Sequence, residues 1–155
     1  MLSIRPTIRN RLHGIALVET VVVTPLLLFL ILATAEVTNA FVDHNTLSKS
    51  VRGATRHLAN HALLGSTGTV VLTVPIITET RNLVVYGNTA GTGSPVLSGL
   101  GVGGVQVVDL GGTNIQVTAS YPYTGLLGGT LPAFGFGADL NMSMTLQATV
   151  TMRAL

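Results

Sequence analysis

The sequence contains no cysteine and no tryptophan, and only 9% of its residues are charged. Without cysteine there is no disulfide framework, no thiolate metal site and no cysteine nucleophile. Typical soluble domains carry about 25% charged residues, so this chain does not have the composition of a free cytosolic protein. Because hydrophobic residues make up 47% of it, intrinsic disorder is excluded as well. The 155 residues suffice for one domain of ordinary size.

The basic charge is concentrated near the N-terminus. Three of the eight lysine and arginine residues, Arg5, Arg9 and Arg11, lie within residues 1–14. The rest of the chain carries the other five basic side chains and all six acidic ones, so the net charge of +2 comes from a short leader. Nucleic-acid binding needs a basic surface on the folded domain, and we therefore expect no nucleic-acid partner.

Residues 15–35 form an apolar run, IALVETVVVTPLLLFLILATA. As a helix with a rise of 1.5 Å per residue, it would span about 32 Å, enough to cross a bilayer core. Because arginines precede the run, the positive-inside rule predicts a cytoplasmic N-terminus and a periplasmic or extracellular C-terminal part. Pro25 removes one helical hydrogen bond and predicts a kink in this transmembrane segment.

Glu19 places a carboxylate inside the apolar run, and such a residue indicates a functional site. A basic leader, Gly14, and an apolar run with glutamate in fifth position form the pattern of a prepilin junction. Cleavage after Gly14 would make Ile15 the new N-terminus. Its ammonium group could then pair with the Glu19 carboxylate, within one helix or between packed helices, which lowers the cost of burying the charge.

Two other interpretations of this region stay open. Ala33-Thr34-Ala35 has the small residues of a signal-peptidase site, and cleavage after Ala35 would release a secreted or surface-binding β-domain. The apolar core before Ala33 is, however, longer than that of usual signal peptides, and it contains Glu19. The other alternative is an uncleaved single-pass anchor with a ligand-binding outer domain. We favour the prepilin interpretation because it alone gives Glu19 a partner.

Helical periodicity continues beyond the apolar run to about residue 62. It predicts one helix of about 45–50 residues, whose second part, residues 36–64, is an amphipathic stalk. Gly65 and Gly68 are expected to end this helix.

Residues 65–155 are predicted to form a β-rich outer domain. Apolar and polar residues alternate without a break from Leu140 to Arg153, and also over residues 114–121, as they do in two-faced strands. Further strands are expected at residues 69–77, 82–86 and 105–110. No second helix is expected. The predicted fold class is therefore α+β and pilin-like, with the long helix packed on a small antiparallel β-sheet.

The stretch from Gly14 to Arg56 resembles the TadE-like family, pilin-like proteins of the tight-adherence (Flp) type IV pilus system. Family members read roughly G-x-A-L-V-E-F near the junction, then have a proline in the leucine run and aromatic and arginine positions on the stalk. The matching positions here are Glu19, Pro25, Glu36, Phe41, Arg52 and Arg56. Thr20 stands where the family usually has an aromatic residue, and a weaker likeness covers Tyr121-Pro122-Tyr123.

This resemblance implies a minor pilin or pseudopilin, a structural or assembly component of a tight-adherence pilus that a prepilin peptidase cleaves after Gly14. The implied partners are other pilins, the peptidase and an inner-membrane assembly platform. The implied location is the cytoplasmic membrane, crossed once, or the extracellular pilus.

The sequence contains no evident catalytic constellation. His57 and His61 have the spacing of a metal-binding pair on a helix, but no third ligand follows nearby. The glycines at 99–104 precede a predicted strand, so they lack the helix N-terminus that a phosphate loop needs. We therefore expect no enzyme, no cofactor, no metal and no small-molecule substrate.

Overall fold

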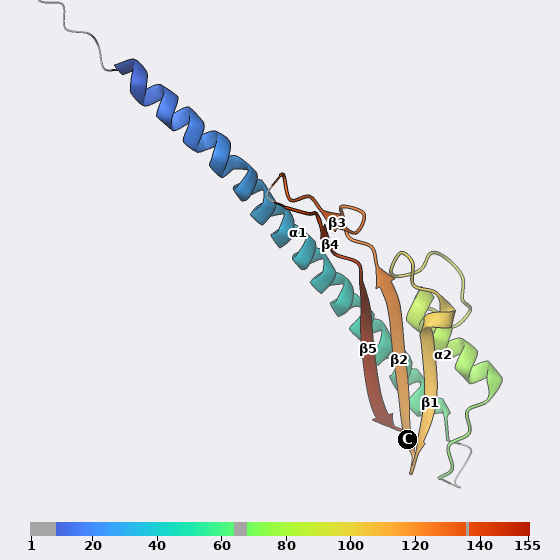
Figure 1. Ribbon diagram of the computed structural model, residues 1–155. Helices are drawn as coiled ribbons and strands as arrows, with labels where there is room; N and C mark the ends of the chain where they lie inside the picture. The colour runs from blue at the N-terminus through green and yellow to red at the C-terminus, as the bar shows by residue number, and fades with distance from the viewer. Residues whose placement is uncertain (1–8, 64–67, 136) are drawn as a thin grey trace, which may run out of the picture.

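The computed structural model describes residues 9–63, 68–135 and 137–155. Its largest element is helix α1 (Arg9–His61), whose N-terminal half projects far beyond the rest of the chain (Figure 1). The other elements lie along the middle and the C-terminal half of this helix. They are α2 (Val74–Tyr86), the 3-10 turn η2 (Val102–Gly104) and strands β1 (Val105–Gly111), β2 (Asn114–Tyr123), β3 (Thr130–Leu131), β4 (Leu140–Asn141) and β5 (Met144–Arg153).

Helix α1 is long because its sequence offers few helix breakers. Between Gly14 and Gly53 the single interruption is Pro25, and the helix continues through it. Four threonine hydroxyls in the apolar run and at the start of the stalk donate hydrogen bonds of 2.7–2.8 Å to the carbonyl four residues earlier, so these hydroxyls have partners within the helix itself. These residues are Thr20, Thr24, Thr34 and Thr38.

Helix α1 ends earlier than expected, at His61. The chain then reverses direction, and the Val71 N–H donates to the Ala62 carbonyl at 2.8 Å. Gly68 lies in this reversal with a φ of 66°, which a residue without a Cβ adopts readily. Gly65 lies outside the described residues.

Helix α2 corrects the expectation of strands at residues 69–77 and 82–86 and of no second helix. Pro75 stands in its first turn, where its missing N–H costs no helical hydrogen bond. Ile76, Thr80 and Val84 recur at four-residue spacing and are buried on one face. Gly87 ends the helix in the left-handed conformation and donates its N–H to the Leu83 carbonyl. The β-branched residues of this segment indicated strands, but a helix allows the segment to bury one apolar face against α1.

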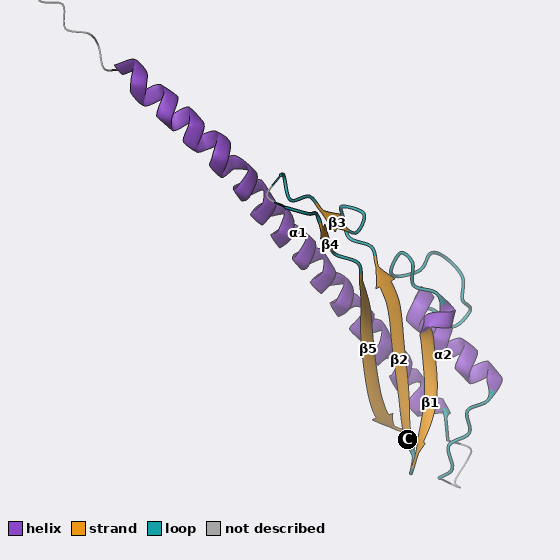
Figure 2. Cartoon of the chain, in the orientation of Figure 1, coloured by secondary structure: helices purple, strands orange, loops and turns teal. Residues whose placement is uncertain are grey.

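The main sheet is antiparallel with strand order β1-β2-β5, which confirms the α+β fold class. The strand expected from Leu140 onward is interrupted, because Asn141 Oδ1 accepts the Ser143 N–H at 2.8 Å and turns the chain. Strand β4 before this turn pairs with β3 in a separate two-stranded hairpin, and β5 after it pairs with β2. Figure 2 shows the hairpin beside the middle of α1 and the main sheet further along the helix.

The core lies between the stalk part of α1, helix α2 and one face of the sheet. Its fully buried side chains include Leu47, Val51 and Leu58 of α1, Val84 and Val85 of α2, and Ile115 and Val117 of β2. On the opposite face, β2 and β5 carry mostly polar side chains, and the hydroxyls of Thr118 and Thr149 lie 3.0 Å apart across these two strands. This arrangement confirms the predicted division of the sheet into an apolar and a polar face.

Candidate functional site

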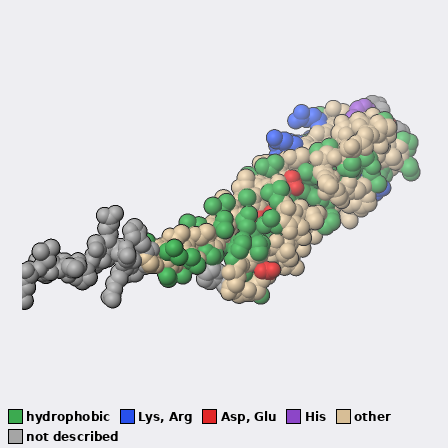
Figure 3. All heavy atoms as spheres, turned by 90° about the horizontal axis from the view of Figure 1, so that it is seen from above, with side chains coloured by type: hydrophobic (Ala, Val, Ile, Leu, Met, Phe, Trp, Pro, Cys, Tyr) green, Lys and Arg blue, Asp and Glu red, His purple; other side chains and the backbone are tan. Residues whose placement is uncertain are grey.

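The N-terminal half of α1 is apolar and exposed. Of the described helices, α1 is long and apolar enough to cross a membrane, and none of its most apolar window is buried. Side chains such as Leu17, Val21 and Leu27 are 52–66% exposed. On the face shown in Figure 3, hydrophobic side chains gather along the slender part of the described molecule, and lysine and arginine side chains lie toward the broad end. An apolar surface of this kind needs lipid or other apolar helices around it.

Gly14 and Glu19 lie on this projecting half and are exposed. A Cβ added at Gly14 would meet nothing within 4 Å, so packing does not require glycine there, although glycine costs about 1 kcal/mol in a helix relative to alanine. The shallow hollow beside Glu19 is lined by uncharged residues: Thr20, Val23, Thr24 and Leu27. A cation for the Glu19 carboxylate therefore has to come from outside this hollow. Ile15 lies one helical turn earlier.

Three of the predicted stalk positions lie on one exposed face of α1. Phe41 is 68% exposed, and Arg52 and Arg56 are exposed as well. Phe41 and Arg52 are 11 residues apart, which returns to within about 20° of the same direction at 3.6 residues per turn. All three side chains are exposed, so the rest of the described chain does not cover this face.

Glu36, the remaining stalk position, lies instead on the inward face and is only 2% exposed. Its Oε2 accepts a hydrogen bond of 3.1 Å from the backbone N–H of Leu126, in the loop after β2. Its Oε1 is buried and has no hydrogen-bond partner among the described residues. A Cβ added at Gly125 would overlap the Glu36 carboxylate, so glycine at this position lets the loop close over the buried group.

Two tyrosines of β2 continue this polar contact toward the sheet. The Tyr123 hydroxyl donates to the Glu36 carbonyl at 3.3 Å and accepts from Asn39 Nδ2 at 3.0 Å. The Tyr121 hydroxyl donates to Asp43 Oδ2 at 2.9 Å. We call these five residues the tyrosine clamp. It fastens β2 to α1 at the point where the helix emerges from its apolar half.

Burial governs the ionisation of the clamp tyrosines. Burial, and secondly the hydrogen bond to Asp43, raises the pKa of Tyr121 well above its ordinary value. Burial also raises the pKa of Tyr123. Both hydroxyls therefore keep their protons at neutral pH and remain hydrogen-bond donors.

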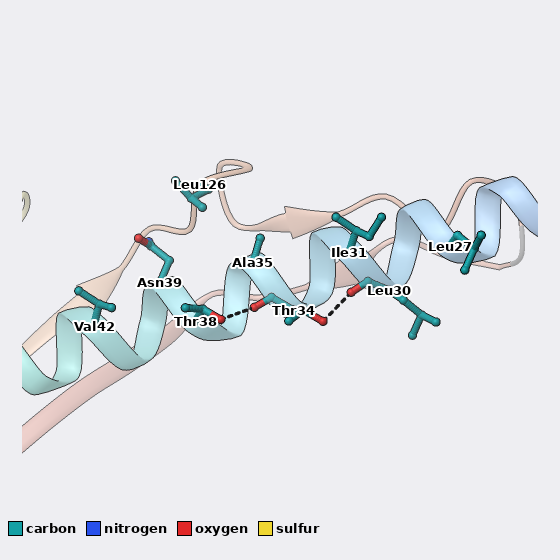
Figure 4. A pocket seen from close by; sticks show the side chains of 9 residues that line it. All are labelled: Leu27, Leu30, Ile31, Thr34, Ala35, Thr38, Asn39, Val42 and Leu126. Carbon is teal, nitrogen blue, oxygen red and sulfur yellow. Dashed lines mark hydrogen bonds between the residues drawn. The ribbon is translucent and has the colours of Figure 1, made fainter.

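A groove follows α1 next to the clamp (Figure 4). Its volume is about 690 Å³, and most of its lining comes from α1 side chains between Leu27 and Val42. Leu126, from the loop after β2, lies near Asn39 and Ala35 and closes one side of the groove. The lining is apolar apart from Thr34, Thr38 and Asn39, so the groove is suited to an apolar occupant.

The rings of His57 and His61 are stacked, with their centroids 4.4 Å apart. The Nδ1 atom of His61 lies 2.8 Å from the His57 carbonyl oxygen, within hydrogen-bond distance. Across residues 9–63, 68–135 and 137–155, no group of three histidine, aspartate or glutamate residues is arranged to hold a metal ion.

The sequence analysis did not identify Asn39, Asp43, Gly125 and Leu126 as parts of a site. A signal for the first two exists. With Glu36 they form a polar stripe at three- and four-residue spacing, and this stripe continues the buried face that Leu47 begins. The contribution of the loop after β2 has no comparable signal, because its contacts join residues about 90 positions apart.

Residues 14–56 match the family model described as TadE-like protein, which confirms the resemblance found in the sequence. The matched segment begins at the predicted junction and ends on the stalk at Arg56. Comparisons with curated proteins and with solved structures found no match. The TadE-like segment associates the chain with the tight-adherence pilus, and its apolar helix is fit to anchor it in a membrane.

Proposed function

We propose that this chain is a minor pilin or pseudopilin-like structural component of a tight-adherence pilus, cleaved by a prepilin peptidase after Gly14. The observation that carries the proposal is Glu19, a carboxylate on an exposed apolar helix with no basic residue lining the hollow beside it. It stands at the fifth position after Gly14, within the segment that matches the TadE-like model. The role is structural rather than enzymatic.

Cleavage would give Glu19 its partner. In the precursor, the Ile15 nitrogen is part of a peptide bond and carries no charge. In the mature chain it is an ammonium group one helical turn from Glu19, and a packed neighbour can supply either member of the pair. Breaking a buried ion pair by removing one member costs about 3–5 kcal/mol, or roughly two to three orders of magnitude in an assembly equilibrium.

The partners follow from this sequence of events. The prepilin peptidase acts on the precursor, and an inner-membrane assembly platform then transfers the mature chain to other pilins. Before cleavage the precursor crosses the cytoplasmic membrane once, with residues 1–14 in the cytoplasm and the sheet outside. The exposed face with Phe41, Arg52 and Arg56 is available for contacts with neighbouring stalks.

The structure gives less support to cleavage after Ala35. The β3–β4 hairpin packs against Leu26 and Phe29, and together with Ala133, Ala138 and Leu140 they line a cavity of about 210 Å³. Removal of residues 1–35 would take away the helical surface on which this hairpin rests. A signal peptide, in contrast, is discarded without loss to the mature fold.

The test is the Glu19→Ala variant, with Thr20→Ala as the matched control. Both residues are exposed on the same apolar helix, but only Glu19 carries a charge. We expect Glu19→Ala to be processed and inserted normally and to be lost from sheared pili and from the assembly platform, whereas Thr20→Ala co-fractionates like the wild type. If Glu19→Ala co-fractionates with pili and platform as well as Thr20→Ala and the wild type do, Glu19 is not required for incorporation into the pilus.

A further inference from the structure

The hairpin segment, which comprises the described residues 124–135 and 137–143 with β3 and β4, rests on the middle of the apolar run. Its residues Ala133, Ala138 and Leu140 line a cavity together with Leu26 and Phe29 of α1. These two helix residues lie near the centre of the run 15–35. Non-helical chain therefore packs against the part of α1 that would lie deepest in a bilayer.

This docked arrangement and a membrane-spanning α1 exclude each other. Residues 15–25, the part of the run that precedes the docking surface, cover about 16 Å at 1.5 Å per residue, roughly half of a hydrocarbon core. If the whole run 15–35 spans the bilayer, the docked segment lies in the hydrocarbon. Strands β3 and β4 form two residue pairs, so many backbone groups of the segment lie outside a ladder, and such groups are not tolerated against lipid. The exposed carboxylate of Asp139 makes this position more costly still.

The attachment of the hairpin segment to α1 is apolar apart from one hydrogen bond. Among the described residues, this bond runs from the Leu126 N–H to the Glu36 carboxylate, at the boundary between the apolar run and the stalk. The other hydrogen bonds of the described segment are internal. Beside the β3–β4 ladder, they join Gly128 to Gly125, Ala133 to Asp139, Met142 to Gly129 and Ser143 to Asn141. The part of the segment beyond Leu126 can therefore leave α1 as a unit and keep these bonds.

Turns at both ends of the β3–β4 hairpin allow such a movement. Gly128 and Gly129 stand between Leu126 and β3, with φ values of 74° and 90°. Because glycine adopts both signs of φ readily, these two residues can absorb a change in backbone direction, as hinge residues do. At the other end, Asn141 Oδ1 accepts the Ser143 N–H and turns the chain between β4 and β5. The hairpin is thus held between two turns, while β2 and β5 stay paired on the stalk.

We propose that the hairpin segment is a two-position cover for α1. It is off the helix while the run 15–35 crosses the membrane, and it docks on the helix once the run has left the bilayer. The structure describes the docked position, in which Leu131 and Ala133 are 2% and 6% exposed. The inference rests on the proposed single membrane span of α1, and not on the peptidase or on the neighbours in a pilus.

The surroundings of α1 decide between the two positions. In the bilayer, lipid tails cover Leu26 and Phe29, and release of the segment returns its backbone groups and Asp139 to water. Outside the bilayer, the same two helix residues would face water, so docking removes apolar surface of both the helix and the hairpin from water. Departure of α1 from the membrane is thereby coupled to closure of the segment on it.

The absence of both cysteine and tryptophan makes a direct test possible. In the full chain, a bimane fluorophore is attached to Leu30→Cys, and its contact quenching by Phe134→Trp is measured. Leu30 and Phe134 are 52% and 42% exposed, and they are the chain neighbours of Phe29 and Ala133, which line the shared cavity. Quenching of this hairpin pair therefore reports the docked position.

A control pair reports that the main sheet is folded. It consists of Thr149→Cys with bimane and Thr118→Trp, at positions whose hydroxyls lie 3.0 Å apart on β5 and β2. These strands do not take part in the movement, so the control pair should be quenched in both positions of the hairpin segment.

Two forms of the chain are compared. One is reconstituted into phosphatidylcholine vesicles. The other, the lysine form, carries Val22→Lys and Leu28→Lys, which oppose insertion of the run, and is measured without lipid. Both side chains are exposed and lie outside the cavity beneath the hairpin. A separate Val22→Trp variant without the lysines reports insertion in vesicles through quenching by lipids brominated near the chain end.

We expect the hairpin pair to be quenched in the lysine form and to lose this quenching in vesicles, while the control pair is quenched in both. Equal quenching of the hairpin pair in vesicles, with Val22→Trp reached by brominated lipid, would overturn the proposal and leave the span intact. An unquenched hairpin pair in the lysine form, beside a quenched control pair, would overturn it as well. If brominated lipid does not reach Val22→Trp, the proposed span is wrong and the inference fails with it.

Discussion

The hydroxyl of Tyr121 is a specific point at which the attachment of β2 to α1 can be weakened. Tyr121→Phe keeps the buried ring, which is 3% exposed, and removes the donor that binds Asp43 Oδ2 at 2.9 Å. A hydrogen bond to a charged group contributes about 1.5–3 kcal/mol. Because Asp43 is only half-buried, water can replace part of the lost bond, and we expect a loss of about 1–2 kcal/mol.

The assay is amide hydrogen exchange of β2 and β5 in the full chain, solubilised in a mild detergent. A loss of 1–2 kcal/mol corresponds to a factor of about 5–30 in the population of the open state, and exchange of these amides should accelerate by the same factor. The double variant with Asp43→Asn completes a thermodynamic cycle, in which the two substitutions are expected to be non-additive.

Tyr86→Phe is the matched control. Tyr86 packs against the same core and is only partly buried, and its hydroxyl forms no hydrogen bond within residues 9–63, 68–135 and 137–155. Its substitution should change the free energy of opening by less than about 0.5 kcal/mol. If Tyr121→Phe accelerates exchange no more than Tyr86→Phe does, the hydrogen bond to Asp43 does not hold the sheet on the helix, and the clamp argument is wrong.

Three further predictions concern pH and glycine positions. Burial raises the pKa of Tyr121 in the folded chain above the value of about 10 that it has when unfolded. The contribution of this hydroxyl to stability is therefore constant below pH 10 and is lost above it, and the stability of Tyr121→Phe should decline less between neutral and strongly alkaline pH than that of the wild type. Gly125→Ala should displace the buried Glu36 carboxylate and accelerate amide hydrogen exchange in residues 124–143. Gly103→Ala should not accelerate this exchange, because the space around its Cβ is open. Gly14→Val should abolish processing on immunoblots but leave membrane insertion intact, and Gly53→Val, at an equally open helical position, should be processed normally.

Regular periodicity was sufficient to predict the largest elements of the fold. The three- and four-residue recurrence of apolar residues predicted α1, since this helix buries one continuous face in the core. Two-residue alternation predicted β2 and β5, because one face of the sheet is buried and the other is polar. Helix α2 was missed since valine, isoleucine and threonine favour strands, while its burial at four-residue spacing depends on packing against α1.

The candidate site also contains residues that the sequence could identify and residues that only the folded structure brings together. The spacing of Gly14 and Glu19 along one helix was enough to single out these two residues, whereas the exposed stalk residues were named from the resemblance to the TadE-like family. The tyrosine clamp and the loop after β2 depend on contacts between residues that lie 78–90 positions apart in the sequence, such as Tyr121 with Asp43 and Leu126 with Glu36. No local sequence pattern predicts contacts between residues so far apart in the chain. These contacts result from the length of α1 and from the turn at Asn141, which ends β4 and allows the β3–β4 hairpin to lie on the helix.

The intact mass of the membrane-associated protein tests the central claim most directly. The account predicts a mature chain that begins at Ile15, with an N-terminal modification as the possible added mass, because cleavage after Gly14 is what gives Glu19 its ammonium partner. A chain beginning at Glu36 would contradict the account in favour of a secreted β-domain. A chain that retains residues 1–14 would contradict it in favour of an uncleaved membrane anchor.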